Sequence, residues 1–204
     1  MRAKRVMDIA IAVPVILILS PLLLLIAGTV ALADGRPVLY LGTRVGQYGR
    51  PFHLFKFRTM VATRVGSERG VSVTVWDDPR ITRLGRLLRH LKLDELPQLF
   101  NVLRGEMSLV GPRPEDPEYV ALYTDEQRRI LDLKPGVTSV AALRYWDEVE
   151  LLRSDDWETV YREQLVPAKL ALELEYARTR TLRRDLGVMV RTAFGLVRHM
   201  VGGS

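Results

Sequence analysis

The sequence of 204 residues contains no cysteine. This absence excludes disulfide bonds, thiolate metal sites and a thiol nucleophile, and it is compatible with a reducing compartment. Aromatic residues make up only 7% of the chain, and they form no evident base-stacking platform interleaved with the basic residues. We therefore expect no nucleic-acid partner.

Internal repeats and low-complexity tracts are also absent from the sequence. The composition is otherwise ordinary for a globular protein, which argues against wholesale disorder. A chain of this length suits one domain with a real core, or a membrane anchor joined to a modest domain.

Charged residues are missing from the whole stretch between Ile9 and Ala33. About twenty apolar residues are enough to cross a bilayer core, so this stretch predicts a membrane segment. A cleaved signal peptide would have a shorter apolar region, and Ala31-Leu32-Ala33 lies late for a cleavage site. A buried helix of this length would be unusual in a soluble protein.

The membrane segment has two unusual features. Ser20-Pro21 lies near its middle, where proline removes a helix hydrogen bond and predicts a kink, and the Ser20 hydroxyl can satisfy a freed backbone group. Basic residues lie on both sides of the segment: Arg2, Lys4 and Arg5 before it, and Arg36, Arg44 and Arg50 after it. Positive flanks tend to stay cytoplasmic, so a spanning helix would export one cluster and a re-entrant hairpin would export neither. These two facts leave both topologies open.

Acidic residues are scarce near the membrane segment. Residues 1–58 contain eight lysines and arginines against only Asp8 and Asp34, so this part carries the whole net charge of +6. The excess suggests anionic lipid headgroups or a phosphorylated substrate. A solvated basic face is the alternative.

The remaining pattern predicts a mainly α fold with a small β element. Short strands are expected at 38–41 and 53–57, and helices at 81–91, 93–103, 117–131 and over most of 154–200. Near the end, an apolar stripe lies beside several arginines and consists of Leu186, Val190, Phe194 and Val197. This stripe fits an interfacial amphipathic helix or a helix that packs on the core.

The strongest chemical signal is the adjacent pair Asp94-Glu95. It follows a dense basic stretch, and Arg113 lies downstream between two prolines. Carboxylates serve as nucleophiles, bases or ligands for hard cations, whereas arginine and lysine bind phosphate oxygens. The combination suits phosphoryl transfer with Mg²⁺ at a membrane surface. The alternative is that both carboxylates only favour the positive start of a helix.

Ordered motifs then point to a family. They are KRVMD at 4–8, Ser20-Pro21 within the apolar run, GRPV at 35–38, RVG at 44–46, FKFRTM at 55–60, DPRIT at 78–82, LGRLLR at 84–89, LDELPQL at 93–99, NVLRGEMSLVGPRP at 101–114 and KPGVT at 134–138. Over about residues 2 to 145 the chain resembles the bacterial sugar transferases called monotopic phosphoglycosyl transferases, in their minimal catalytic form. The segment 139–145 departs from many relatives and suggests a subgroup, so it puts any inherited sugar preference in doubt.

The resemblance implies a reaction and a place for it. Such enzymes move a sugar 1-phosphate from a UDP-sugar to undecaprenyl phosphate, release UMP, and begin a capsule, O-antigen, exopolysaccharide or glycoprotein glycan. It implies a re-entrant hairpin at 1–34 and a catalytic α/β domain at 35–204, with a helical part at 154–204 and amphipathic interfacial helices. We expect the cytoplasmic face of the bacterial inner membrane, with membrane lipids, later glycosyltransferases and further copies of the chain as partners. A non-catalytic scaffold for glycan assembly is the alternative.

The resemblance also implies roles for individual residues. Asp94 matches the nucleophile that forms a phosphosugar-aspartyl intermediate, and Glu95 matches its partner, either as a metal ligand or as a base. Both carboxylates are the expected Mg²⁺ ligands. The expected phosphate- and substrate-binding residues are Lys56, Arg58, Arg89, Gln98 and Arg113. Ser20 and Pro21 match the break in the membrane helix.

Overall fold

The protein was analysed as a computed structural model that describes residues 2–61, 78–153 and 156–201. Its helices are α1 (Arg2–Ala33), η1 (Gln47–Gly49), α2 (Arg83–His90), η2 (Leu93–Glu95), α3 (Gln98–Arg104), α4 (Pro117–Val120), α5 (Asp125–Arg128), η3 (Arg129–Asp132), α6 (Val140–Arg144), α7 (Glu148–Leu151), α8 (Trp157–Thr159), η4 (Val160–Leu165), α9 (Val166–Thr179) and α10 (Leu182–Val201). Its strands are β1 (Leu39–Val45), β2 (Pro51–Phe57), β3 (Ser108–Val110) and β4 (Gly136–Thr138). The prediction of a mainly α fold with a small β element is confirmed. The helical part expected at 154–204 includes residues 154–155 and 202–204, which lie outside the described ranges.

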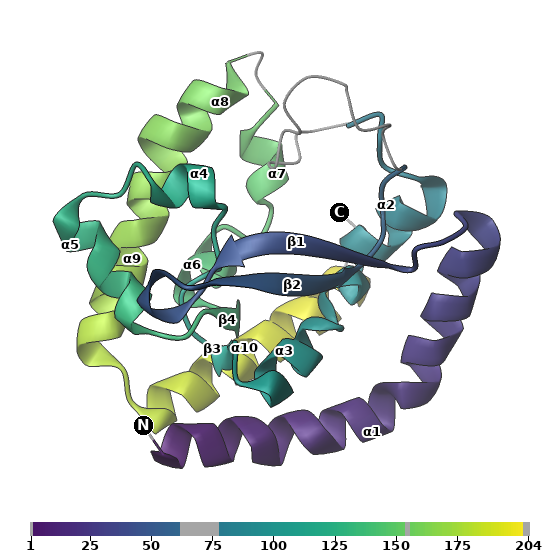
Figure 1. The fold of residues 1–204 in the computed structure, drawn as a ribbon, viewed down its shortest axis with the longest axis horizontal. Coiled ribbons are helices and arrows are strands. Elements are labelled where there is room, and N and C mark those ends of the chain that lie inside the picture. The colour runs from purple at the N-terminus through teal and green to yellow at the C-terminus, as the bar shows by residue number, and fades with distance from the viewer. Residues whose placement is uncertain (1, 62–77, 154–155, 202–204) are drawn as a thin grey trace.

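Helix α1 is one continuous helix that bends as it passes along the edge of the molecule (Figure 1). Pro21 has no N–H with which to reach the Leu17 carbonyl four residues earlier. The Ser20 hydroxyl donates to that same carbonyl at 2.8 Å. The side chain thus replaces the missing backbone bond, and two arms meet at a bend rather than at a loop.

The first arm of α1 is fixed by polar contacts to distant elements. Lys4 Nζ lies 2.5 Å from Asp185 of α10, and Arg5 donates to two carbonyls in the last turn of α3 at 2.5 and 2.8 Å. The buried carboxylate of Asp8 accepts from the Ser108 hydroxyl at 3.1 Å. These basic residues therefore hold α1 onto the rest of the fold, in addition to any contact with lipid headgroups.

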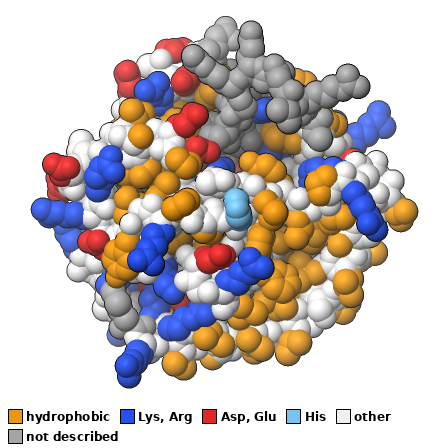
Figure 2. All heavy atoms as spheres, viewed as in Figure 1, with side chains coloured by type: hydrophobic (Ala, Val, Ile, Leu, Met, Phe, Trp, Pro, Cys, Tyr) orange, Lys and Arg blue, Asp and Glu red, His pale blue; other side chains and the backbone are white. Residues whose placement is uncertain are grey.

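Apolar side chains remain exposed along the outer face of α1. By length and composition this helix could cross a membrane. Its exposed members are Val6, Ile9, Val13, Leu17, Ile18, Leu24, Leu25 and Leu32. Figure 2 shows hydrophobic side chains gathered at the lower right, over the region that α1 occupies in Figure 1.

Helix α10, like α1, has a buried face and an exposed apolar face. Val188 is fully buried, whereas the predicted stripe is exposed to solvent, with Val190 at 67% and Phe194 at 70%. Of the two alternatives for this stripe, packing on the core is therefore excluded. The stripe remains available for an interface.

The two predicted strands form an antiparallel hairpin. Their register runs from Leu39↔Phe57 to Val45↔Pro51, so both strands are longer than predicted. A second, parallel pair joins β3 to β4. The sequence did not predict it, because strands of three residues are too short to reveal an alternating pattern.

Two of the predicted helices are divided. The one expected at 93–103 contains the short turn η2 and then α3, because Pro97 cannot donate in a continuing helix. The helix expected at 117–131 is interrupted and begins again after Thr124, the N-cap of α5. The Thr124 hydroxyl accepts from the Gln127 N–H, and the Gln127 side chain accepts from the Thr124 N–H. The first division is what presents Asp94 and Glu95 on their own turn.

Candidate active site

The carboxylate pair lies on the turn η2, between α2 and α3. Helix α2 ends at His90, and Lys92 then adopts a left-handed backbone with φ 54° and ψ 21°. Asp94 is buried, with 6% of its surface exposed, and Glu95 is half-buried. The two carboxylates are adjacent in the chain, but their surroundings differ.

Glu95 is held by two cations from distant segments. Its Oε1 lies 2.7 Å from Lys56 Nζ of β2 and 3.5 Å from an Arg113 guanidinium nitrogen. Burial alone would raise the pKa of Glu95, but the positive charges of Lys56, Arg113 and Lys92 together hold it well below the usual range. Glu95 is therefore ionised at neutral pH.

Asp94 has no such partner. Within the described residues its carboxylate makes no hydrogen bond or ion pair, although Lys56 and Arg89 influence it electrostatically. Burial raises the pKa of Asp94, and the negative charge of Glu95 acts in the same direction, while the nearby cations oppose both. A buried, uncommitted carboxylate among cations is suited to nucleophilic attack on a phosphate.

Three further predicted binding residues occupy different positions. Arg89 donates to the Thr59 hydroxyl at 2.8 Å, and both site carboxylates influence its charge, so it borders the site. Arg58 donates to the carbonyls of Asp34 and Gly35 and thereby caps the end of α1. None of the hydrogen bonds of Arg58 reaches the carboxylate pair. The cap gives Arg58 a structural task, and its role in phosphate binding stays a prediction.

Gln98 is buried in the first turn of α3, four residues after Asp94. Its side chain makes no hydrogen bond within the described part of the chain. Its predicted contact with substrate is not tested by this arrangement.

The loop that carries Arg113 is fixed by backbone contacts on two sides. Gly111 donates to the Thr138 carbonyl at 3.1 Å, and Gly136 donates to the Pro112 carbonyl at 2.9 Å. A Cβ on Gly111 would lie 2.3 Å from a backbone oxygen. The close approach therefore requires glycine, and it fixes the Arg113 backbone next to β4.

A second polar cluster, which the sequence did not predict, lies behind Arg113. Glu115 accepts from the Tyr161 hydroxyl at 3.1 Å and from Lys169 Nζ at 3.3 Å. Lys169 also lies 3.1 Å from Glu148. Burial and the neighbouring carboxylates raise the pKa of Tyr161 strongly, so it remains a neutral donor. The residues that pair in this cluster lie 21 to 54 positions apart in the sequence, so no local pattern identifies them.

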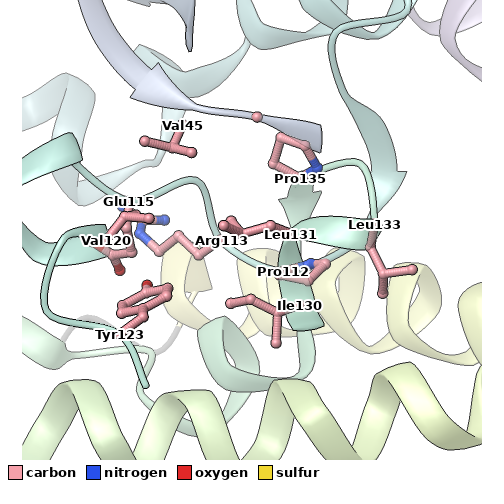
Figure 3. Close-up of a pocket in the computed structure, with 11 residues that line it drawn as sticks. Val45, Pro112, Arg113, Glu115, Val120, Tyr123, Ile130, Leu131, Leu133 and Pro135 are labelled. Atoms are coloured by element: carbon pink, nitrogen blue, oxygen red, sulfur yellow. The ribbon is translucent and has the colours of Figure 1, made fainter. Parts of the chain in front are cut away.

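A small, mostly apolar cavity lies beside the Arg113 loop (Figure 3). Its volume is about 10 Å³, which is room for about one water molecule. Arg113, Glu115 and Tyr123 line it together with Pro112 and Pro135. The space is too small for a nucleotide.

The carboxylate pair fits Mg²⁺ as a partial ligand set. The described residues contain no group of three or more histidines, cysteines or acids that could enclose a metal ion. Mg²⁺ typically takes one or two carboxylates and completes its shell with water and substrate phosphates. Asp94 and Glu95 supply hard oxygen donors of that kind, with Asp94 uncommitted.

Comparison with known proteins identifies the family. The model of the bacterial sugar transferase family matches residues 1–199, and the chain belongs to this family. The chain is 39% identical, over 95% of its length, to a UDP-glucose:undecaprenyl-phosphate glucose-1-phosphate transferase of Caulobacter vibrioides. It is 33% identical to the Escherichia coli protein of the same name over 94% of its length, and to an undecaprenyl-phosphate galactose phosphotransferase of Salmonella typhimurium over 96%.

The chain spans 69% of the Caulobacter protein, 39% of the Escherichia coli protein and 40% of the Salmonella protein. The expected family and the expected enzyme class, a sugar-1-phosphate transferase, are confirmed. Nothing in these comparisons favours a non-catalytic scaffold.

Proposed function

We propose that this protein transfers a sugar 1-phosphate from a UDP-sugar to undecaprenyl phosphate and releases UMP. The observation that carries the proposal is the asymmetry of the carboxylate pair. Asp94 is uncommitted, while Glu95 is ion-paired with Lys56 and Arg113. The names of the relatives support the substrate classes.

The reaction has two displacement steps. A carboxylate oxygen of Asp94 attacks the β-phosphorus, the new O–P bond forms, and the bond to the α-phosphate oxygen breaks, so UMP leaves with the electron pair. A phosphate oxygen of the lipid then attacks the same phosphorus and releases the Asp94 carboxylate. Since each step needs one substrate, donor and lipid need not bind together.

Glu95 is suited to holding cations rather than to accepting a proton. Its pKa is held low by the surrounding positive charges, and a carboxylate with a low pKa is a weak base. Lys56 and Arg113, which flank Glu95, are placed to receive phosphate oxygens. When bound between Asp94, Glu95 and the substrate, Mg²⁺ would neutralise phosphate charge.

The acceptor lipid determines where the site must lie. Its phosphate stays at the headgroup level, so the carboxylate pair must stay near the bilayer surface. Exposed apolar faces on α1 and α10 support this placement. We infer that α1 is re-entrant, that α10 lies in the interface, and that the site faces the cytoplasm of a bacterial inner membrane.

The product would be the first lipid-linked sugar of a bacterial glycan, to be extended by later glycosyltransferases. A UMP-release assay with undecaprenyl phosphate and a set of UDP-sugars, with and without Mg²⁺, tests the reaction class, the donor and the metal together. Asp94→Asn should remove UMP release while the unfolding temperature stays unchanged. Full turnover by a folded Asp94→Asn protein would overturn the assignment of the nucleophile.

A further inference from the structure

Lys92 is a basic residue beside the carboxylate pair. It is not among the predicted phosphate- and substrate-binding residues. It and Tyr48 are the non-glycine residues with a positive φ among the described parts of the chain. Such a backbone is strained and persists only where surrounding structure enforces it. The strained position comes directly before the turn that carries Asp94 and Glu95.

The side chain of Lys92 lies against Trp146. Its Nζ is 5.6 Å from the centre of the Trp146 ring, within the range of a cation–π contact, and 3.4 Å from the Trp146 carbonyl oxygen. Glu95 and Asp94 attract the Lys92 charge, and Arg113 and Lys56 repel it. Lys92 therefore shares the electrostatic environment of the carboxylate pair without pairing with either member.

The other site cations have different partners. Lys56 and Arg113 donate to the Glu95 carboxylate, and Arg89 donates to Thr59 and has a further contact. The three donors of Lys92 have one long hydrogen bond, to a carbonyl, among the described residues. Its ammonium group can therefore bind an anion without breaking an ion pair.

Trp146 is itself held in place. Its ring packs on Gly195 of α10, where an added Cβ would lie 3.3 Å from a ring carbon, and on the ring of His199. The indole nitrogen is buried without a hydrogen-bond partner among the described residues. This packing leaves the ring little freedom to move, so it provides a fixed surface for the Lys92 ammonium.

We propose that Lys92, supported by Trp146, is a further phosphate-binding residue of this site. Its ligand is a phosphate oxygen, which either the diphosphate of the nucleotide sugar or the phosphate of the lipid acceptor can supply. The inference rests on the proposed function, because the two phosphates are those of its substrates. It gives α10 a link to the site, through Gly195, Trp146 and Lys92.

The test compares Lys92→Met and Lys92→Arg in the full chain in lipid nanodiscs. The matched control is Arg83→Met, which removes an exposed cation of α2 that has no side-chain hydrogen bond or ion pair among the described residues. Three quantities are measured for each protein: the Kd of UDP, the KM of the UDP-sugar and the KM of undecaprenyl phosphate. Thermal unfolding reports whether each variant is folded.

If Lys92 binds the donor, Lys92→Met raises the Kd of UDP and the donor KM by about tenfold to a hundredfold, as expected for one charge-assisted hydrogen bond. If it binds the acceptor, only the KM of undecaprenyl phosphate rises. Lys92→Arg, which keeps the charge, should recover most of either loss, and Arg83→Met should resemble the wild type.

The inference is overturned if a folded Lys92→Met protein keeps all three constants, or if only its unfolding temperature falls. UMP release by the wild type is measured in the same preparation. If the wild type releases no UMP, the proposed function is refuted. The Kd of UDP for Lys92→Met still tests whether Lys92 binds phosphate. As a graded variant, Gly195→Ala crowds the Trp146 ring and should weaken the same ligand as Lys92→Met, to a smaller extent.

Discussion

The ammonium group of Lys56 lies 2.7 Å from the carboxylate of Glu95, whereas the neighbouring carboxylate of Asp94 has no ion pair among the described residues. Arg113 approaches the same Glu95 oxygen from a different segment. The two acids are adjacent in sequence but have different partners. In the proposed mechanism, Glu95 holds the cations and Asp94 reacts.

Lys56→Met should lower kcat/KM by about a hundredfold, because one electrostatic contact to the reacting phosphate is lost and Glu95 keeps only its longer pairing with Arg113. Lys56→Arg should recover part of this loss, since it restores the charge with a different shape. UMP-release kinetics with a folded-state control measure both effects. Equal activity of Lys56→Met and the wild type would show that the ion pair has no catalytic part.

The bend in α1 predicts a topology that labelling can measure. The chain has no cysteine, and Arg2 and Arg36 are exposed at the two ends of the helix. Single Arg2→Cys and Arg36→Cys proteins in sealed, oriented vesicles should react with an impermeant reagent from the same side. Reaction from opposite sides would restore the simple spanning helix.

Pro21→Ala should favour that spanning form. Alanine supplies an N–H to the Leu17 carbonyl, which Ser20 now satisfies, so the reason for the bend is removed. In this background we expect part of the Arg36→Cys label to move to the opposite side. A matched Pro14→Ala change, in the first arm, should leave the labelling pattern as in the wild type.

Glu173 makes the stability of the fold depend on pH. The residue is buried, Ala141 donates to its Oε1 at 3.2 Å, and its Oε2 has no hydrogen-bond partner among the described residues. Burial raises the pKa of Glu173 from 4.5 to about 7, against the opposing hydrogen bonds of Ser139 and Ala141. The neutral form is therefore favoured in the folded state.

Because the folded pKa is the higher one, the stabilisation is complete below about pH 4.5 and is lost as the pH rises through about 7. The loss corresponds to about 3 kcal/mol of unfolding free energy. Glutamine does not ionise, so the Glu173→Gln protein should not lose this stability. Its unfolding free energy relative to the wild type should therefore increase by about 3 kcal/mol between about pH 4.5 and about pH 8. Denaturant unfolding at both pH values measures the difference. A constant difference would contradict the raised pKa.

Local signals in the sequence indicated Asp94-Glu95 as the candidate pair and predicted most of the regular structure. The Asp94-Glu95 pair is contiguous, and the apolar run and both strands of the hairpin have recognisable patterns. The kink residues were also readable, since a proline within an apolar helix has a defined effect on the carbonyl of Leu17. These features depend on neighbouring residues alone.

Contacts between distant segments were not predictable in this way. The Lys92 contact with Trp146 and the hydrogen bonds of Glu115 with Tyr161 and Lys169 depend on how the helices pack. The position of the Arg58 side chain was likewise not readable from its motif. The motif suggests phosphate binding, whereas tertiary packing directs the Arg58 guanidinium to the end of α1.

The central claim is covalent catalysis by Asp94, and trapping the intermediate tests it most directly. The wild type is mixed with UDP-sugar without undecaprenyl phosphate, quenched in acid, and digested for peptide mass spectrometry. Covalent catalysis predicts one equivalent of UMP and a phosphosugar adduct on Asp94, which disappears when undecaprenyl phosphate is added. An adduct on another residue, or UMP release only when both substrates are present, would contradict it.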